Sequence, residues 1–187
     1  MRKILFILFI LGCENTITDT NSQSHTTDNG IVINEINYNS SLNLDSEDWV
    51  ELYNPTSESI EISLWEFRDE GNIFIIPENV ILNPGDYLVL CKDLNMFTNQ
   101  FPNISNTIGD FDFGLNGGGE RIRLFDINGL LIDEVEYDDN SPWPIEADGY
   151  GPTLELIDAF LDNTIAENWN TSNINGGTPG TINSIIE

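Results

Sequence analysis

The sequence predicts an all-β sandwich, on three observations. Short segments rich in β-branched and aromatic residues recur along the chain with turn residues between them. Helical periodicity is almost absent. The pair Asn128-Gly129 joins two alternating segments, and such a pair is the strongest short-range signal of a β-hairpin. Many short strands at this spacing are typical of two packed sheets.

Each expected strand is a short apolar or alternating run that ends at residues typical of turns. In chain order we expect strands near residues 31–38, 49–53, 60–64, 65–68, 73–76, 87–91, 121–125, 130–137 and 153–157. The breaks carry Asn54-Pro55, Glu70-Gly71, Asn83-Pro84-Gly85, the run 116–119 and the run 149–152. The hairpin should have a type I′ turn, which needs positive φ at both central residues. One short helical turn is expected within residues 160–169.

Composition narrows the class of partner. The chain has 187 residues, 40% of them hydrophobic, which suits one domain with a hydrophobic core. It has 32 acidic residues and only six Lys and Arg, for a formal net charge of −26. Binding to nucleic acid normally needs clustered Lys and Arg. We therefore expect no nucleic-acid partner, and a surface that attracts cations.

The N-terminal residues have the pattern of a bacterial lipoprotein signal. Arg2 and Lys3 precede an apolar run at 4–11, and Gly12 and Cys13 follow it at once. The run is shorter than the roughly 20 apolar residues of a membrane span and matches a secretory signal. We expect lipidation of Cys13 and a membrane attachment through that lipid in the bacterial cell envelope, at the outer membrane, in the periplasm or on the cell surface. The alternative is an ordinary signal peptide with a coincidental cysteine.

The expected organisation follows from this pattern. Residues 1–12 are the lipoprotein signal peptide, and residues 13–29 are the lipidated cysteine and a disordered tether, because this stretch has too little apolar surface to fold. Residues 30–183 form one β-sandwich domain, and residues 184–187 form a tail.

Two expected strands carry a glutamate at their centre. Glu35 lies in Ile33-Asn34-Glu35-Ile36, and Glu51 lies in Trp49-Val50-Glu51-Leu52. A charge inside a half-buried strand costs free energy unless another group pairs with it. These two glutamates are therefore the first candidates for a functional or structural role.

The two glutamate segments and the closing run 175–183 (NGGTPGTIN) resemble the bacterial lamin-tail domain. Further matches follow in the same order as in that family: Ser63-Leu64-Trp65, Pro84-Gly85-Asp86-Tyr87-Leu88-Val89, Leu124-Phe125-Asp126-Ile127-Asn128-Gly129, Asp133-Glu134-Val135-Glu136-Tyr137, the run 151–156 and Asn168-Trp169. The resemblance runs from about residue 30 to residue 183 and implies an immunoglobulin-like β-sandwich. The family pattern has a glycine before Trp65, which this chain lacks, so the local turn is left open.

The residues present exclude several kinds of catalysis. The single histidine, His25, lies in the expected tether, so Ser-His and Cys-His nucleophilic chemistry has no base. Acid-only chemistry is left, and a metal-dependent hydrolase that uses the acidic residues is the alternative to a protein that is not an enzyme. No cofactor is required by any motif.

Calcium is the metal that clustered carboxylates suit, because it takes about six to eight oxygen ligands. These acids give a candidate calcium site at Glu35, Asp48, Glu51 and Asp133. The competing interpretation is that Glu35 and Glu51 pair with an arginine (Arg68, Arg121 or Arg123) or accept main-chain N–H bonds from a neighbouring loop.

Trp143 and Cys91 have expected roles as well. Trp143 stands between two prolines in an expected loop, where it could bind a ligand in a calcium-assisted carbohydrate-binding module; the alternative is a tryptophan that folds back over the sandwich end. Cys91 lies in an apolar strand and should be a buried thiol. The function expected first is a non-catalytic, envelope-anchored module for adhesion, scaffolding or the binding of an unidentified protein or glycan.

Overall fold

The computed structural model describes residues 30–186, so the expectations for the signal peptide, Cys13 and the tether lie outside the described residues. The described residues form strands β1 (Val32–Asn37), β2 (Trp49–Tyr53), β3 (Ile60–Glu61), β4 (Glu66–Arg68), β5 (Ile73–Ile75), β6 (Ile81–Leu82), β7 (Tyr87–Cys91), β8 (Thr107–Ile108), β9 (Glu120–Phe125), β10 (Leu131–Tyr137), β11 (Leu154–Leu156) and β12 (Trp169–Thr171). They also form one α-helix, α1 (Leu94–Gln100), and two short 3-10 helices, η1 (Ile145–Ala147) and η2 (Ala166–Asn168). Among these residues no helix has the length and apolar content that a membrane span needs.

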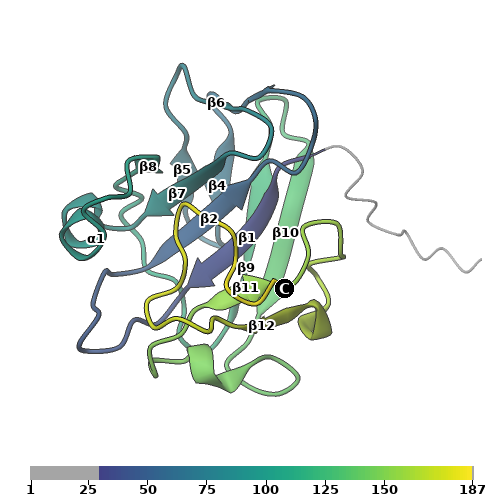
Figure 1. Ribbon diagram of the computed structural model, residues 1–187. Coiled ribbons are helices and arrows are strands. Elements are labelled where there is room, and N and C mark those ends of the chain that lie inside the picture. The colour runs from purple at the N-terminus through teal and green to yellow at the C-terminus, as the bar shows by residue number, and fades with distance from the viewer. Residues whose placement is uncertain (1–29, 187) are drawn as a thin grey trace, which may run out of the picture.

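Two sheets pack face to face, as Figure 1 shows. One sheet has the order β12-β11-β1-β2-β7-β8, and the other has the order β10-β9-β4-β5; a small β3-β6 pair lies beside them. Buried aliphatic and aromatic side chains from both sheets form the core between them, including Ile33, Val50, Phe67, Ile122 and Leu154. The predicted all-β sandwich is confirmed.

Most expected strands occur, and the exceptions are local. The strands at 49–53 and 87–91 have the expected bounds, but the run 60–64 is extended only over β3, because Trp65 N–H donates to the Ile62 carbonyl and closes a turn. The two- and three-residue strands β6, β8 and β12 were not predicted. Neither was α1, which begins where Asp93 Oδ1 accepts a hydrogen bond from Met96 N–H. The short helical turn expected within 160–169 is η2.

The hairpin between β9 and β10 is confirmed, but its turn type was predicted wrongly. Gly129 has φ +79°, whereas Asn128 is not among the residues with positive φ. Gly129 N–H donates to the Asp126 carbonyl, and Asp126 N–H donates to the Leu130 carbonyl. Ile127 and Asn128 are therefore the centre of a three-residue loop with a left-handed glycine after it, the geometry of a type I turn with a bulge.

Alternation along β2 separates the two faces of the six-stranded sheet. Val50 and Leu52 join the core, and Trp49 and Glu51 point to the outer face. Two different covers protect that outer face (Figure 1). Helix α1 covers its apolar part through Phe97, whose ring lies edge-on to Trp49 at 5.9 Å. Residues 176–185, which we call the C-terminal strap, cross its polar part.

The turn before Trp65 forms without a glycine. Leu64 takes the left-handed conformation, with φ +61°, and donates its N–H to the Ile76 carbonyl at 3.0 Å. A leucine is strained there, since its Cβ crowds the backbone. The turn left open by the sequence therefore keeps the backbone that glycine favours, at a cost in free energy.

We expect Leu64→Gly to raise the free energy of unfolding by up to about 1 kcal/mol. Left-handed backbone costs a non-glycine residue about 1–2 kcal/mol, and glycine's greater freedom in the unfolded chain offsets about 0.5–1 kcal/mol of that gain. Urea unfolding of the two proteins measures the difference. Leu64→Ala is the control, because it removes the side chain and keeps the strain; an equal gain in both variants would show that φ is not the cause.

Candidate functional site

Three glutamates stand side by side across the six-stranded sheet. Glu35 in β1 pairs directly with Glu51 in β2 on one side and with Glu155 in β11 on the other. All three residues are fully buried, with 0% of their surface exposed to solvent. Like charges placed opposite each other in a sheet repel, and burial makes each charge costly. We call these residues the glutamate row.

The C-terminal strap supplies the donors that the glutamate row needs. Its main-chain N–H groups reach all three side chains: Thr178 N–H donates to Glu35 at 2.9 Å, Gly180 N–H to Glu51 at 2.5 Å and Ile185 N–H to Glu155 at 3.2 Å. Ser184 adds a hydroxyl bond to Glu155 at 2.9 Å. Of the two interpretations for Glu35 and Glu51, the loop N–H bonds are therefore the ones observed.

Close approach of the strap depends on Gly177. Its φ is +79°, and a Cβ built there would lie 2.1 Å from Glu35 Oε1. No side chain fits at that distance, so glycine is the residue that lets the strap backbone lie on the sheet.

The hydroxyl of Thr178 lies between two carboxyl groups of the glutamate row. Its Oγ1 lies 2.8 Å from Glu155 Oε1 and 3.3 Å from Glu35 Oε2. A hydroxyl has one proton to donate, and the shorter distance gives it to Glu155. Glu35 Oε2 then faces a lone pair of Thr178, an arrangement that favours a proton on Glu35. Burial raises the pKa of Glu35 well above its ordinary value, and the neighbouring charge of Glu51 raises it further.

Glu51 differs from Glu35 because N–H donors meet both of its oxygens. Asn34 Nδ2 donates to Oε1 at 2.9 Å, and Gly180 N–H donates to Oε2. Asn34 Nδ2 also donates to Asn183 Oδ1 at 2.8 Å, which fixes the orientation of the amide. Burial raises the pKa of Glu51 too, and these hydrogen bonds offset only part of that rise. The hydrogen bonds thus favour a proton on Glu35 over one on Glu51, whose two oxygens both accept N–H bonds.

Asp133 is buried at a different place, between the two sheets. Its Oδ2 accepts hydrogen bonds from Ile33 N–H at 2.6 Å and from Asn163 Nδ2 at 2.7 Å. Both strands shift register here, β1 between Ile33 and Glu35 and β10 between Leu131 and Asp133. Burial raises the pKa of Asp133 to about 7. Asp133 therefore ties β10 to β1 where their pairing with other strands is irregular.

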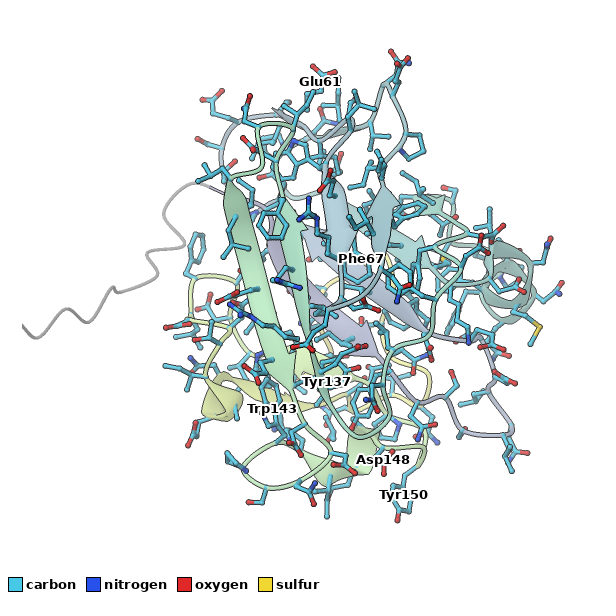
Figure 2. The ribbon with its side chains drawn as sticks, turned by 180° about the vertical axis from the view of Figure 1, so that it is seen from behind. Glu61, Phe67, Tyr137, Trp143, Asp148 and Tyr150 are labelled. Carbon is cyan, nitrogen blue, oxygen red and sulfur yellow. The ribbon has the colours of Figure 1, made fainter. Side chains whose placement is uncertain are left out.

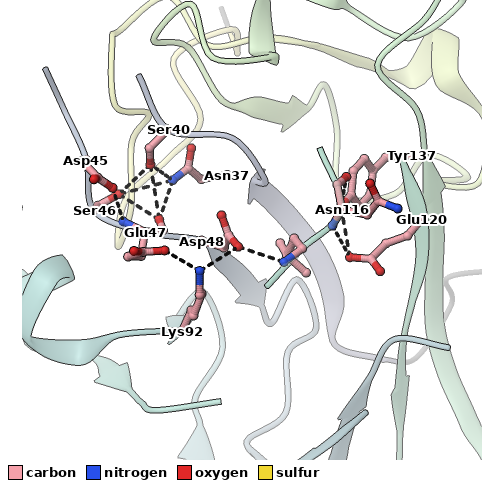
Figure 3. A network of polar contacts seen from close by, with 11 residues as sticks. Asn37, Ser40, Asp45, Ser46, Glu47, Asp48, Lys92, Asn116, Glu120 and Tyr137 are labelled. Atoms are coloured by element: carbon pink, nitrogen blue, oxygen red, sulfur yellow. Dashed lines mark hydrogen bonds and ion pairs between the residues drawn. The ribbon is translucent and has the colours of Figure 1, made fainter. Parts of the chain in front are cut away.

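Asp48 lies in a third environment, on the loop before β2 (Figure 3). Its Oδ2 accepts Leu115 N–H at 2.8 Å and lies 3.7 Å from Lys92 Nζ, which itself binds Glu47 Oε2 at 2.5 Å. Burial raises the pKa of Asp48 to about 6. This contact joins the loop before β2 to the chain that leads into β9.

The four acids assigned to calcium therefore do not form one ligand set. Glu35 and Glu51 are neighbours, but Asp133 and Asp48 each have their own main-chain partner elsewhere. Within residues 30–186, no group of three or more His, Cys, Asp or Glu side chains has an arrangement that could hold a metal ion. The three arginines considered as partners lie on the other sheet: Arg68 contacts Glu66, Arg121 contacts Glu134, and Arg123 donates to the Asp69 carbonyl.

Trp143 and Cys91 are both packed inside the protein. Trp143 is 7% exposed and packs against Trp169, with ring centroids 6.0 Å apart, at the same end of the molecule as Asp148 and Tyr150 (Figure 2). Trp143 is among the residues that line a hollow of about 330 Å³, but its ring is almost fully buried and does not offer an open face for a sugar. Cys91 is a free buried thiol, and burial raises its pKa to about 12.

Sequence reasoning missed Glu155, the third member of the glutamate row. The same signal that identified Glu35 and Glu51 was present, since Glu155 stands between Leu154 and Leu156 in an expected strand. That pattern predicts a buried acid wherever an acidic residue stands between two apolar residues of a strand and another segment can cover the face of the sheet on which the acid lies.

We expect Glu35→Gln to keep the free energy of unfolding at pH 7 at or above the wild-type value, because wild type has already lost stability between pH 4.5 and pH 7, and Glu51→Gln to lower it by about 1–3 kcal/mol. Glutamine reproduces a protonated glutamate at position 35, where its amide donates to Thr178. At position 51 it turns an N–H toward Asn34 or Gly180, both of which are donors. Chemical denaturation at pH 7 measures both variants, and equal losses would contradict the placement of the proton.

The same pair of variants predicts a pH dependence. A carboxyl group whose pKa is raised in the folded state stabilises the fold fully only at a pH below its ordinary pKa, 4.5. This contribution is lost as the pH rises from there through the raised pKa. Thermal unfolding between about pH 5 and pH 9 should therefore show wild-type stability falling relative to Glu35→Gln, which has no proton to lose at that position. Parallel profiles would mean that Glu35 does not titrate in this range.

The family model of the lamin tail domain matches residues 24–139, more than half of the chain. Among solved structures, a DUF4876 family protein from Bacteroides thetaiotaomicron is similar, with 12% sequence identity and a TM-score of 0.48 over 82% of this chain and 71% of that chain. No curated protein matches the sequence. The match to the family model confirms the resemblance seen in the strand motifs, and the chain belongs to the lamin tail domain family.

Proposed function

We propose that this protein is a non-catalytic binding module, held at the bacterial cell envelope by a lipid on Cys13, that acts in adhesion, scaffolding or ligand binding. The use of its acids is the observation that supports this most. Glu35, Glu51 and Asp133 are buried, and each accepts a hydrogen bond from a main-chain N–H. Carboxylates sealed in this way hold backbone in place and do not meet a substrate.

The chain enters the domain at Gly30, beside Ile132 near the start of β10, where a Cβ at Gly30 would lie 3.3 Å from the Ile132 side chain. The residues between Cys13 and Gly30 reach roughly 50 Å when fully extended, since each residue spans about 3.3 Å. A domain on such a tether can meet partners at some distance from the membrane surface.

The charge of the protein bears on the class of partner. The formal net charge is −26, with six Lys and Arg in the whole chain. Phosphate backbones and anionic headgroups are repelled by such a surface, whereas basic protein segments are attracted. The proposal therefore favours a protein or an uncharged glycan and excludes nucleic acid.

We expect Cys13→Ser to move the protein from the membrane fraction to the soluble fraction of bacterial cells, because serine cannot receive the thioether-linked lipid. Fractionation followed by immunoblotting measures the shift, and labelling with a fatty-acid analogue should be lost in parallel.

Cys91→Ala is the matched control, since this second cysteine is buried in the domain and should leave both the fractionation and the label unchanged. Retention of Cys13→Ser in the membrane fraction with its label intact would contradict lipidation at Cys13. Retention without the label would mean that another contact holds the protein at the membrane.

A further inference from the structure

A hollow of about 400 Å³ opens at the end of the sandwich marked by Glu61, opposite the end that carries Trp143 and Tyr150 (Figure 2). Three segments that are distant in sequence surround it: the turn between β3 and β4, the loop between β5 and β6, and the tip of the β9–β10 hairpin. Its principal lining residues are Leu64, Trp65, Ile127, Glu61, Glu78 and Asn79.

The walls of this hollow are fixed without a ligand. Ile62 N–H donates to the Val80 carbonyl at 3.0 Å, and Ser63 Oγ accepts Val80 N–H at 3.0 Å, so the first two segments are bonded to each other. In the hairpin tip, Asp126 Oδ1 accepts the N–H of Leu130 at 2.8 Å. A site held in this way loses little conformational freedom when a partner binds.

The floor of the hollow is apolar, and its rim is acidic. Trp65 is 7% exposed and forms the floor, while Leu64 is 39% and Ile127 is 62% exposed. Glu61 and Glu78 are exposed beside these side chains. Binding sites for small groups combine an apolar lining with a few polar groups placed at its edge, and this hollow has that composition.

Two residues of the same lining have left-handed backbone. Leu64 has φ +61° and Asn79 has φ +66°, both in the region that favours glycine. The strain at Leu64 holds an aliphatic side chain partly in solvent, where it makes no use of core packing. Strained residues of this kind are retained where the surrounding structure enforces them, and they cluster at binding sites.

We propose that this hollow binds a segment of a partner protein in which an apolar side chain stands next to a lysine or arginine. The apolar side chain enters between Leu64 and Ile127 above Trp65, and the cation meets Glu61 and Glu78. Charge complementarity selects this occupant, because the acidic rim belongs to a chain of net charge −26 that repels anionic partners. The inference rests on the proposed function as a binding module and names the chemistry of its partner.

The test is titration calorimetry with the full-length protein in neutral detergent. The first probe is a short amidated peptide of alternating leucine and lysine, and the second has serine in place of leucine at the same charge. We expect the leucine peptide to bind at least about tenfold more tightly, since burial of one leucine side chain is sufficient for that ratio.

Variants of the lining separate specific binding from bulk charge. Leu64→Gly should weaken binding of the leucine peptide about tenfold while thermal stability is kept or raised, so that lost binding is not unfolding. Glu78→Gln should weaken it several-fold and flatten its salt dependence. Glu136→Gln, an exposed acid on β10 that does not line this hollow, removes the same charge and should change binding little.

Three results would overturn the inference: equal binding of the two peptides, an unchanged affinity in Leu64→Gly, or binding to zwitterionic lipid vesicles in place of the peptide. The same variants are also fractionated, which reports on the lipid at Cys13 independently of peptide binding. Loss of peptide binding with intact fractionation removes this inference alone, whereas loss of the lipid-dependent fractionation removes the proposed anchoring.

Discussion

The hydrogen bonds between the C-terminal strap and the glutamate row are the constraint on which the closed fold depends. Three carboxyl groups lie at the centre of the largest sheet, and an unpaired buried polar group costs about 1–3 kcal/mol or more. The donors come from residues far along the chain, since Glu35 and Thr178 are separated by 143 positions. The sheet therefore becomes stable only when the last residues of the domain are in place.

This dependence explains the composition of the strap. Gly177 allows the backbone to touch Glu35, Thr178 supplies an N–H and a hydroxyl, and Gly180 presents its N–H to Glu51. The bonds from Ser184 and Ile185 to Glu155 show that the packed domain extends beyond Asn183, where the sequence placed its end. This glycine-rich run is thus a structural element without regular secondary structure.

Most strands and two members of the glutamate row could be predicted from the sequence, because both depend on local alternation, as in Val50-Glu51-Leu52. Which acids lie close together could not be predicted. Asp48 and Asp133 have the same chemistry as Glu51, but their partners, Leu115 and Ile33, are set by how distant segments pack. Helix α1 was not predicted for a related reason. Its seven residues are stabilised by the Asp93 cap and by packing of Phe97 on Trp49, a contact with the outer face of the sheet that the local sequence does not reveal.

The acids of this chain therefore divide into two groups with opposite physical roles. The buried group accepts hydrogen bonds from main-chain N–H groups, so substitutions in it act on the stability of the fold. The exposed group, which includes Glu61 and Glu78, leaves the backbone alone and sets the electrostatic potential around the apolar hollow at Leu64. Because Leu64 bears strain that a glycine would relieve, the hollow is a place where the protein gives up stability to keep an aliphatic side chain exposed, and such exchanges are characteristic of surfaces that bind.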